Sequence, residues 1–118
     1  MREDFKKEWV AALRSGEYKQ GYGELKNNTG EYCCLGVACD LLVKKGLAKE
    51  QTSNGLNVYA LSNDNDLDWS VLPKSIANYL GLSKDPDIIV DGEAHCISGV
   101  NDEGKTFSEI ATLIEEQL

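Results

Sequence analysis

The chain has 118 residues, a length typical of one domain with a hydrophobic core of its own. Its 20 acidic and 12 basic residues give a net charge of −8, which disfavours nucleic-acid binding because phosphates repel such a chain. No apolar run approaches the length of a membrane span, and the charged start at residues 1–7 lacks the apolar core of a signal peptide. We therefore expect a cytoplasmic protein that is not associated with a membrane, with its four cysteines reduced.

The first predicted element is an amphipathic helix. Phe5, Trp9 and Leu13 follow helical spacing, and Gly16 can end the helix in the left-handed conformation. Residues 21–33 then alternate around a turn rich in Asn and Gly, which predicts a short β-hairpin.

A second helix is predicted over residues 34–45, with Gly46 as its cap. It is apolar around most of its circumference, so we expect it at the centre of the fold. Residues 47–71 are the least regular part of the chain, with a turn at 52–55 and a partly alternating strand at 56–61.

The predicted third helix begins at a Ser70 cap, has Pro73 in its first turn and ends at Gly81. A short strand at 87–91 and a turn at 100–104 follow.

Thr106 and Glu109 have the spacing of a capping box, which predicts a last helix running to the end of the chain. Together these elements predict a single α+β domain over residues 1–118. About four helices pack with a small antiparallel sheet, built from the 21–33 hairpin and the strands at 56–61 and 87–91.

Three segments carry a family resemblance. They are Trp9–Gln20 (WVAALRSGEYKQ), Tyr32–Val37 (YCCLGV) and Asn101–Ala111 (NDEGKTFSEIA). In this order they resemble a family of small uncharacterised bacteriophage and prophage proteins. The resemblance implies a phage-type accessory protein, and it brings no catalytic residue with it.

One pair of residues suggests an enzyme. Cys34 stands at a predicted helix start, where the helix dipole stabilises a thiolate, and His95 is the only histidine. A cysteine hydrolase that uses Cys34 and His95 is therefore the alternative function. The other interpretation, which the sequence favours, is that these cysteines are small buried apolar residues.

Metal sites find little support in the sequence. Cys34 and Cys39 are five residues apart, which is not the spacing of zinc ligands. The alternating acids of residues 64–68 resemble the start of a calcium loop, but Trp69 and Ser75 stand where Gly and Glu are needed. We expect no metal and no cofactor.

A ligand site is possible near residues 21–23, where a Gly-x-Gly segment could approach an anion. The candidate ligand-binding residues are Arg14, Lys19, Gln20 and Tyr22. The simpler interpretation is a hairpin in which the glycines adopt backbone angles that other residues avoid and the charged side chains are solvated. Trp69, beside the acidic loop, is a candidate contact for a partner.

The sequence therefore favours a non-enzymatic binding protein that contacts a host protein or a small ligand. It does not decide between a monomer and a small homo-oligomer, because apolar stripes for a core and for a subunit interface look alike.

Overall fold

The computed structural model describes all residues, 1–118, and has the predicted α+β fold. The helices are α1 (Glu3–Arg14), α2 (Cys34–Lys44), α3 (Lys74–Leu80), α4 (Ile97–Asp102) and α5 (Phe107–Gln117). The strands are β1 (Ala48–Ser53), β2 (Leu56–Leu61), β3 (Asp87–Val90) and β4 (Glu93–Cys96). None of the helices, the longest of which has 12 residues, is long and apolar enough to span a membrane.

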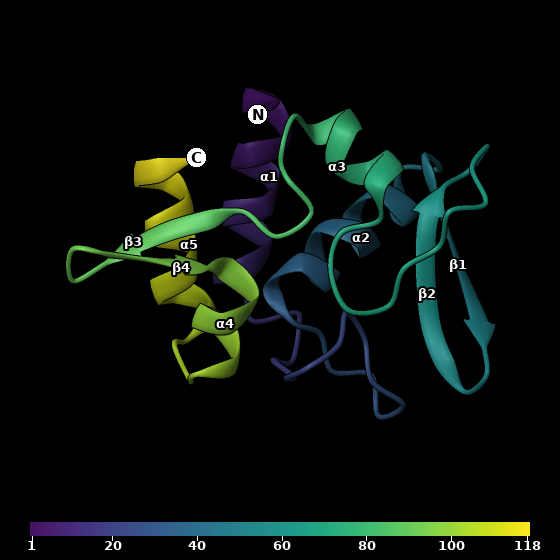
Figure 1. Ribbon diagram of the computed structural model, residues 1–118, viewed down its shortest axis with the longest axis horizontal. Coiled ribbons are helices and arrows are strands. Elements are labelled where there is room, and N and C mark those ends of the chain that lie inside the picture. The colour runs from purple at the N-terminus through teal and green to yellow at the C-terminus, as the bar shows by residue number, and fades with distance from the viewer.

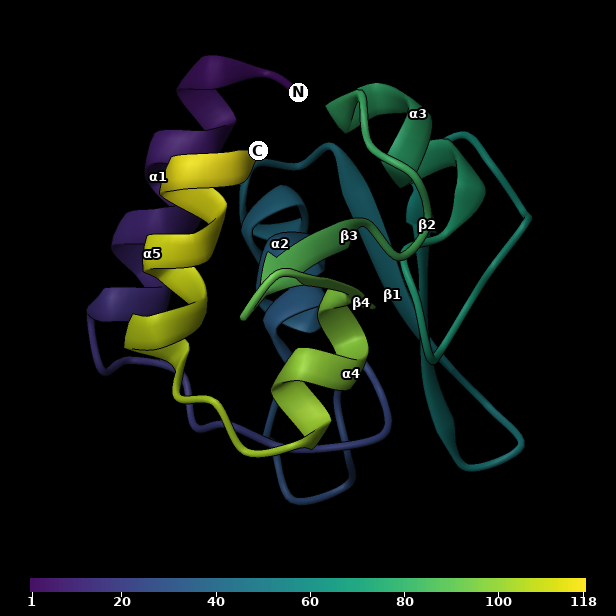
Figure 2. The same ribbon diagram turned by 60° about the vertical axis from the view of Figure 1, so that its left-hand side comes forward.

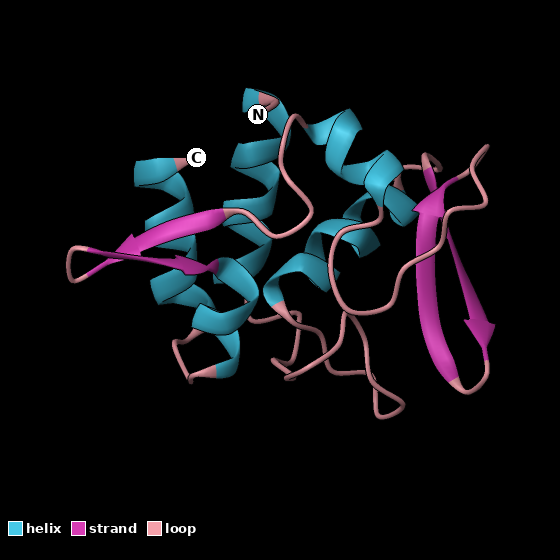
Figure 3. Ribbon diagram, viewed as in Figure 1, coloured by secondary structure: helices cyan, strands magenta, loops and turns pink.

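The strands form two separate antiparallel hairpins, β1–β2 and β3–β4 (Figure 1). These hairpins lie at opposite ends of the long axis, with helices between them (Figure 3). α1 and α5 run side by side, and the two chain termini lie at the same end of this pair (Figure 2).

Helix α2 is central, as its composition predicted. Eight of its eleven residues are buried, including the first seven from Cys34 to Asp40. It packs against α1, where the Trp9 indole N–H donates to the Cys34 carbonyl oxygen at 2.9 Å. Trp9 is fully buried, so its removal to alanine would cost about 3–5 kcal/mol.

A close backbone contact fixes the position of the loop before α2. A Cβ at Gly36 would overlap the carbonyl group of Leu25, so only glycine permits this approach. Gly36 therefore lets residues 15–33, which we call the N-terminal loop, pack directly on α2.

The predicted hairpin at 21–33 is wrong. The N-terminal loop has only isolated bridges, in which Gln20 and Lys26 each pair with Tyr32. Its strand-like segment bonds elsewhere instead, because the Leu25 N–H donates to the Trp69 carbonyl oxygen at 2.8 Å.

The strands at 56–61 and 87–91 are confirmed as β2 and β3, whereas their partners β1 and β4 and the short α4 were not predicted. The capping box of α5 is confirmed, since Thr106 and Glu109 bond each other's backbone N–H groups. The predicted Ser70 cap is wrong. Leu72 precedes a proline, which disfavours helical geometry at that residue, so the helix cannot begin at Ser70 and its N-cap is Pro73.

Candidate binding site

Cys34 and His95 do not form an exposed catalytic pair. The Cys34 side chain is fully buried, and burial raises its pKa well above the usual thiol value despite the helix start. His95 lies on β4 beside Glu93, and no hydrogen bond joins it to Cys34. A thiol that stays protonated and out of reach of water is not a nucleophile.

Behind Cys34 lies a buried polar side chain that the sequence analysis did not single out. Asn101 is completely buried in α4, and its Oδ1 accepts from the Cys34 N–H at 3.2 Å and from Gln20 Nε2 at 3.0 Å. Its Nδ2 donates to the Gly21 carbonyl oxygen at 2.9 Å. One amide thus joins α4, the start of α2 and the N-terminal loop.

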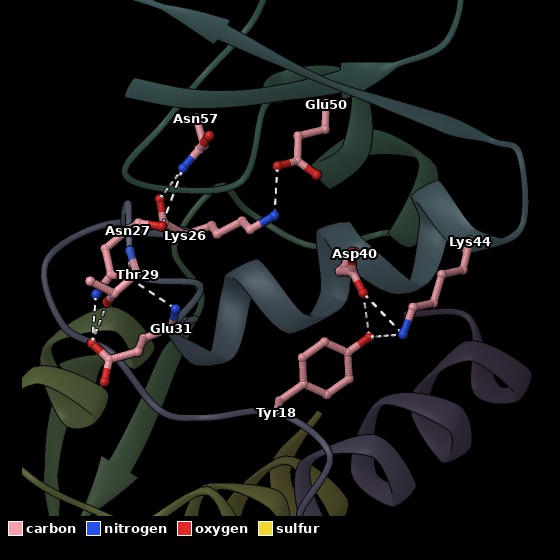
Figure 4. Close-up of polar contacts among 9 residues, drawn as sticks. All are labelled: Tyr18, Lys26, Asn27, Thr29, Glu31, Asp40, Lys44, Glu50 and Asn57. Atoms are coloured by element: carbon pink, nitrogen blue, oxygen red, sulfur yellow. Dashed lines mark hydrogen bonds and ion pairs between the residues drawn. The ribbon is translucent and has the colours of Figure 1, made fainter. Parts of the chain in front are cut away.

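The N-terminal loop is also anchored along the side of α2 (Figure 4). The Tyr18 hydroxyl donates to the Asp40 carboxylate and accepts from Lys44 Nζ at 3.0 Å. Burial raises the pKa of Tyr18, and the hydrogen bond to Asp40 acts in the same direction. Tyr18 therefore stays a neutral phenol that holds the loop in place.

A second set of bonds fixes the far end of the loop (Figure 4). Asn27 Oδ1 accepts from the backbone N–H groups of Thr29 and Glu31 at 3.0 and 2.9 Å. Lys26 Nζ bonds Glu50 on β1 at 3.0 Å. The loop lacks regular secondary structure, but side-chain bonds hold it at both ends.

A small hollow opens where this loop meets α4 and the segment before α3. Its volume is about 130 Å³. It is lined by Gly23, Glu24, Cys33, Ser70, Val71, Ser98 and Asp102. This is less than the 300–1,000 Å³ typical of small-molecule pockets, and it suits a single side chain.

Two exposed aromatic residues are next in sequence to residues that line the hollow. Tyr22 precedes the lining residue Gly23 and is 56% exposed, and Trp69 precedes Ser70 and is 41% exposed. The bond between Leu25 and Trp69 brings the two loops together. Exposed aromatic side chains beside a hollow are typical of protein contact sites.

The lining of the hollow is acidic. Glu24 and Asp102 contribute carboxylates, and no lysine or arginine lines it. Asp102 Oδ1 accepts from the Gly23 N–H at 3.0 Å and from Asn101, while its Oδ2 and both oxygens of Glu24 make no hydrogen bond within the chain. These oxygens can accept bonds from a cationic group.

Cys33 is almost completely buried at the base of the hollow. Burial raises its pKa to about 11, and the nearby carboxylates of Asp102 and Asp85 act in the same direction. The thiol is therefore neutral, and the negative charge of the hollow comes from the carboxylates alone.

The structure places the four predicted ligand-binding residues apart. Arg14 bonds Thr112 and Glu115 on α5, and Gln20 bonds Asn101 and the Lys105 carbonyl oxygen. Lys19 pairs with Glu31 at 3.6 Å on the surface. Of the four residues, Tyr22 is the one next in sequence to a residue that lines the hollow.

A larger hollow of about 420 Å³ lies on the outer surface of α1 and α5. Lys6, Lys7 and Arg14 line it together with Glu3 and Glu115, and it contains no aromatic side chain. Arg14 is already paired with Glu115 across it. With mixed charges and no aromatic side chain, it is the weaker candidate.

No three side chains of His, Cys, Asp or Glu converge as metal ligands would. The Asp64 carboxylate instead accepts from the backbone N–H groups of Asn65 and Asp66, and these bonds lower its pKa. At the end of this segment Asp68 pairs with Lys84 at 3.2 Å, so these carboxylates serve local and tertiary bonds.

Comparison with known families adds one match. The family described as "Domain of unknown function (DUF8296)" matches residues 1–118. The chain belongs to this family. No curated protein and no solved structure matches it. The match covers the hollow, the two exposed aromatic residues and the N-terminal loop, so the site lies within the family's domain.

Proposed function

We propose that the protein is a non-enzymatic binding protein whose hollow receives a lysine or arginine side chain of a partner protein. The observation that carries this proposal is that two exposed aromatic residues, Tyr22 and Trp69, are each next in sequence to a lining residue of a hollow that contains Glu24 and Asp102. Aromatic faces attract cations, and unpaired carboxylate oxygens accept hydrogen bonds from them.

The overall charge supports a basic partner. A net charge of −8 accelerates encounter with a cationic surface and repels an acidic one. The resemblance to bacteriophage proteins favours a host protein as that partner.

The anchoring of the N-terminal loop supports binding without a large ordering cost. Tyr18 and Asn27 hold the loop on both sides of Tyr22, so the aromatic side chain stands on a fixed backbone. A site that is already ordered loses less entropy on binding. The burial of Cys34 weighs against the hydrolase alternative in the same region.

The proposal can be tested by titrating the protein with a five-residue peptide that has two arginines between glycines. A matched peptide with glutamates in place of the arginines is the control. We expect saturable heat and a change in tryptophan fluorescence with the arginine peptide only, weakening as salt screens the charges. The fluorescence change reports on Trp69, because Trp9 is fully buried.

Single-residue variants test whether the peptide binds at the hollow. Trp69→Ala and Glu24→Gln should each weaken binding by about fivefold or more, in line with cation–π and charged hydrogen-bond energies. Leu47→Ala is the matched control, since Leu47 is also 41% exposed but lies outside the hollow. Equal binding of both peptides, or an equal effect of all three variants, would refute the proposal.

A further inference from the structure

The β3–β4 hairpin has a geometry that fixes which backbone groups face outward. A two-residue turn at Asp91 and Gly92, both with positive φ, pairs Val90 with Glu93. In such a hairpin the residues beside the turn exchange hydrogen bonds, and the next pair points its N–H and C=O groups away from the partner strand. That next pair is Ile89 and Ala94.

The outer edge of β3 is closed by one side chain. The Ile89 N–H donates to Gln117 Oε1 at 2.7 Å, and Gln117 Nε2 donates to the Ile89 carbonyl oxygen at 2.9 Å. The carboxamide of Gln117 thus makes the two bonds that an adjoining strand would make. This pair of bonds also confirms that Ile89 faces outward from the hairpin.

The outer edge of β4 is open. Ala94 stands opposite Ile89, so its N–H and C=O groups point away from β3, and neither bonds another part of the chain. Glu93, Ala94 and Cys96 are all exposed, and the small Ala94 side chain leaves the edge accessible. An unprotected edge of this kind is a template for a further strand.

The charges beside this edge indicate which strand fits. Asp91 and Glu93 flank it, and the Glu93 side chain is 81% exposed, with His95 Nε2 3.8 Å from one of its carboxylate oxygens. A second copy of the chain would bring the same carboxylates and a further charge of −8. At the opposite end of the molecule, the charges of Lys49 and Glu50 on β1 cancel. The edge of β1 therefore favours neither a basic nor an acidic partner.

We infer that the outer edge of β4 pairs with an extended segment of a partner protein that carries lysine or arginine at alternate positions. The Ala94 N–H and C=O groups supply the backbone bonds, and Glu93 selects the basic side chains. This surface does not depend on the hollow, because none of the residues that carry it lines that site.

The test uses a seven-residue peptide of alternating lysine and valine and a version that is N-methylated at every residue. The methylated peptide has the same charge but lacks backbone donors along both edges. In hydrogen exchange by NMR, we expect the first peptide to slow exchange of the Ala94 amide by about tenfold or more. We expect the methylated peptide to leave that amide unchanged.

Two variants complete the test. Ala94→Pro removes an N–H that the hairpin does not use, so it should abolish binding in calorimetry, whereas Ala94→Val should retain it. If Ala94→Pro does not fold, the comparison of the two peptides decides alone. Equal binding of both peptides, or an Ala94 amide that exchanges at the same rate with and without peptide, would overturn the inference.

Discussion

The Asn101 side-chain oxygen accepts a hydrogen bond from the backbone N–H of Cys34, a residue 67 positions earlier in the chain. The first N–H groups of a helix have no partner within the helix. Here a side chain of α4 supplies one of those partners for α2. The same oxygen accepts from Gln20, so the contact also orders the N-terminal loop.

Asn101→Ala should lower the free energy of unfolding by about 2–4 kcal/mol, because it leaves the Cys34 N–H and the Gly21 carbonyl group buried without partners. Urea unfolding followed by circular dichroism measures the change. Asn78→Ala is the control, since Asn78 is exposed and its side chain makes no hydrogen bond, and it should change stability by less than about 0.5 kcal/mol. Equal effects of the two variants would contradict the role of Asn101.

Gly36→Ala should destabilise the protein by about 3 kcal/mol or more, because the added Cβ would overlap the Leu25 carbonyl group and force the loop away from α2. Gly99→Ala is a suitable comparison within another helix. There the nearest atom is the Cys96 sulfur at 3.2 Å, which a side-chain rotation can move. Thermal unfolding of both variants tests the difference, and a stable Gly36→Ala protein would show that the contact is not required.

Tyr59→Phe should leave stability unchanged or raise it by up to about 1 kcal/mol. Tyr59 is fully buried and its hydroxyl has no hydrogen-bond partner, so removing that group leaves nothing unpaired. Tyr18→Phe should cost about 1 kcal/mol, since it breaks the bonds to Asp40 and Lys44. A loss of stability in Tyr59→Phe as large as that in Tyr18→Phe would contradict this assignment.

Iodoacetamide should modify a single thiol in the native protein. Cys96 is exposed, whereas the other three cysteines are buried, with at most 1% of their surface accessible. Mass spectrometry should show one adduct on the native protein, lost in Cys96→Ser, and four adducts in denaturant. Rapid labelling of Cys34 in the native protein would instead support the alternative function as a cysteine hydrolase.

Stability should fall above about pH 9. Burial raises the pKa of Cys39 in the folded protein, so its thiol stays protonated when the same thiol ionises in the unfolded chain. The unfolded state then binds fewer protons, and each such group lowers the free energy of unfolding by about 1.4 kcal/mol per pH unit. Cys39→Ala should therefore show a shallower decline between pH 9 and 10.5 in reductant, whereas an unchanged slope would contradict the burial of this thiol.

Much of the fold follows from local rules in the sequence. The apolar stripe of α1 and the capping box of α5 are local patterns, and both elements were predicted. β1 was missed because Ala-Lys-Glu-Gln-Thr-Ser neither alternates nor favours strands, although Asn54 and Gly55 form the turn that joins it to β2. β4 has a similar composition and follows the turn at Asp91.

The site was less predictable, because it depends on contacts between distant segments. The segments that hold Tyr22 and Trp69 come together through a backbone bond between Leu25 and Trp69, and no sequence spacing indicates that bond. Cys34 stands at a helix start as predicted, but burial outweighs the effect of the helix dipole on its thiol. Asn101 was placed in a turn, and only the packing of α4 on α2 shows that it is buried.

The most direct test of the proposed function is amide NMR of the protein titrated with the arginine peptide. We expect shifts concentrated at residues 22–24, 69–71, 98 and 102, and their loss in Trp69→Ala. Shifts confined to other surfaces, such as the outer face of α1 and α5, would contradict it, as would an unchanged spectrum at millimolar peptide.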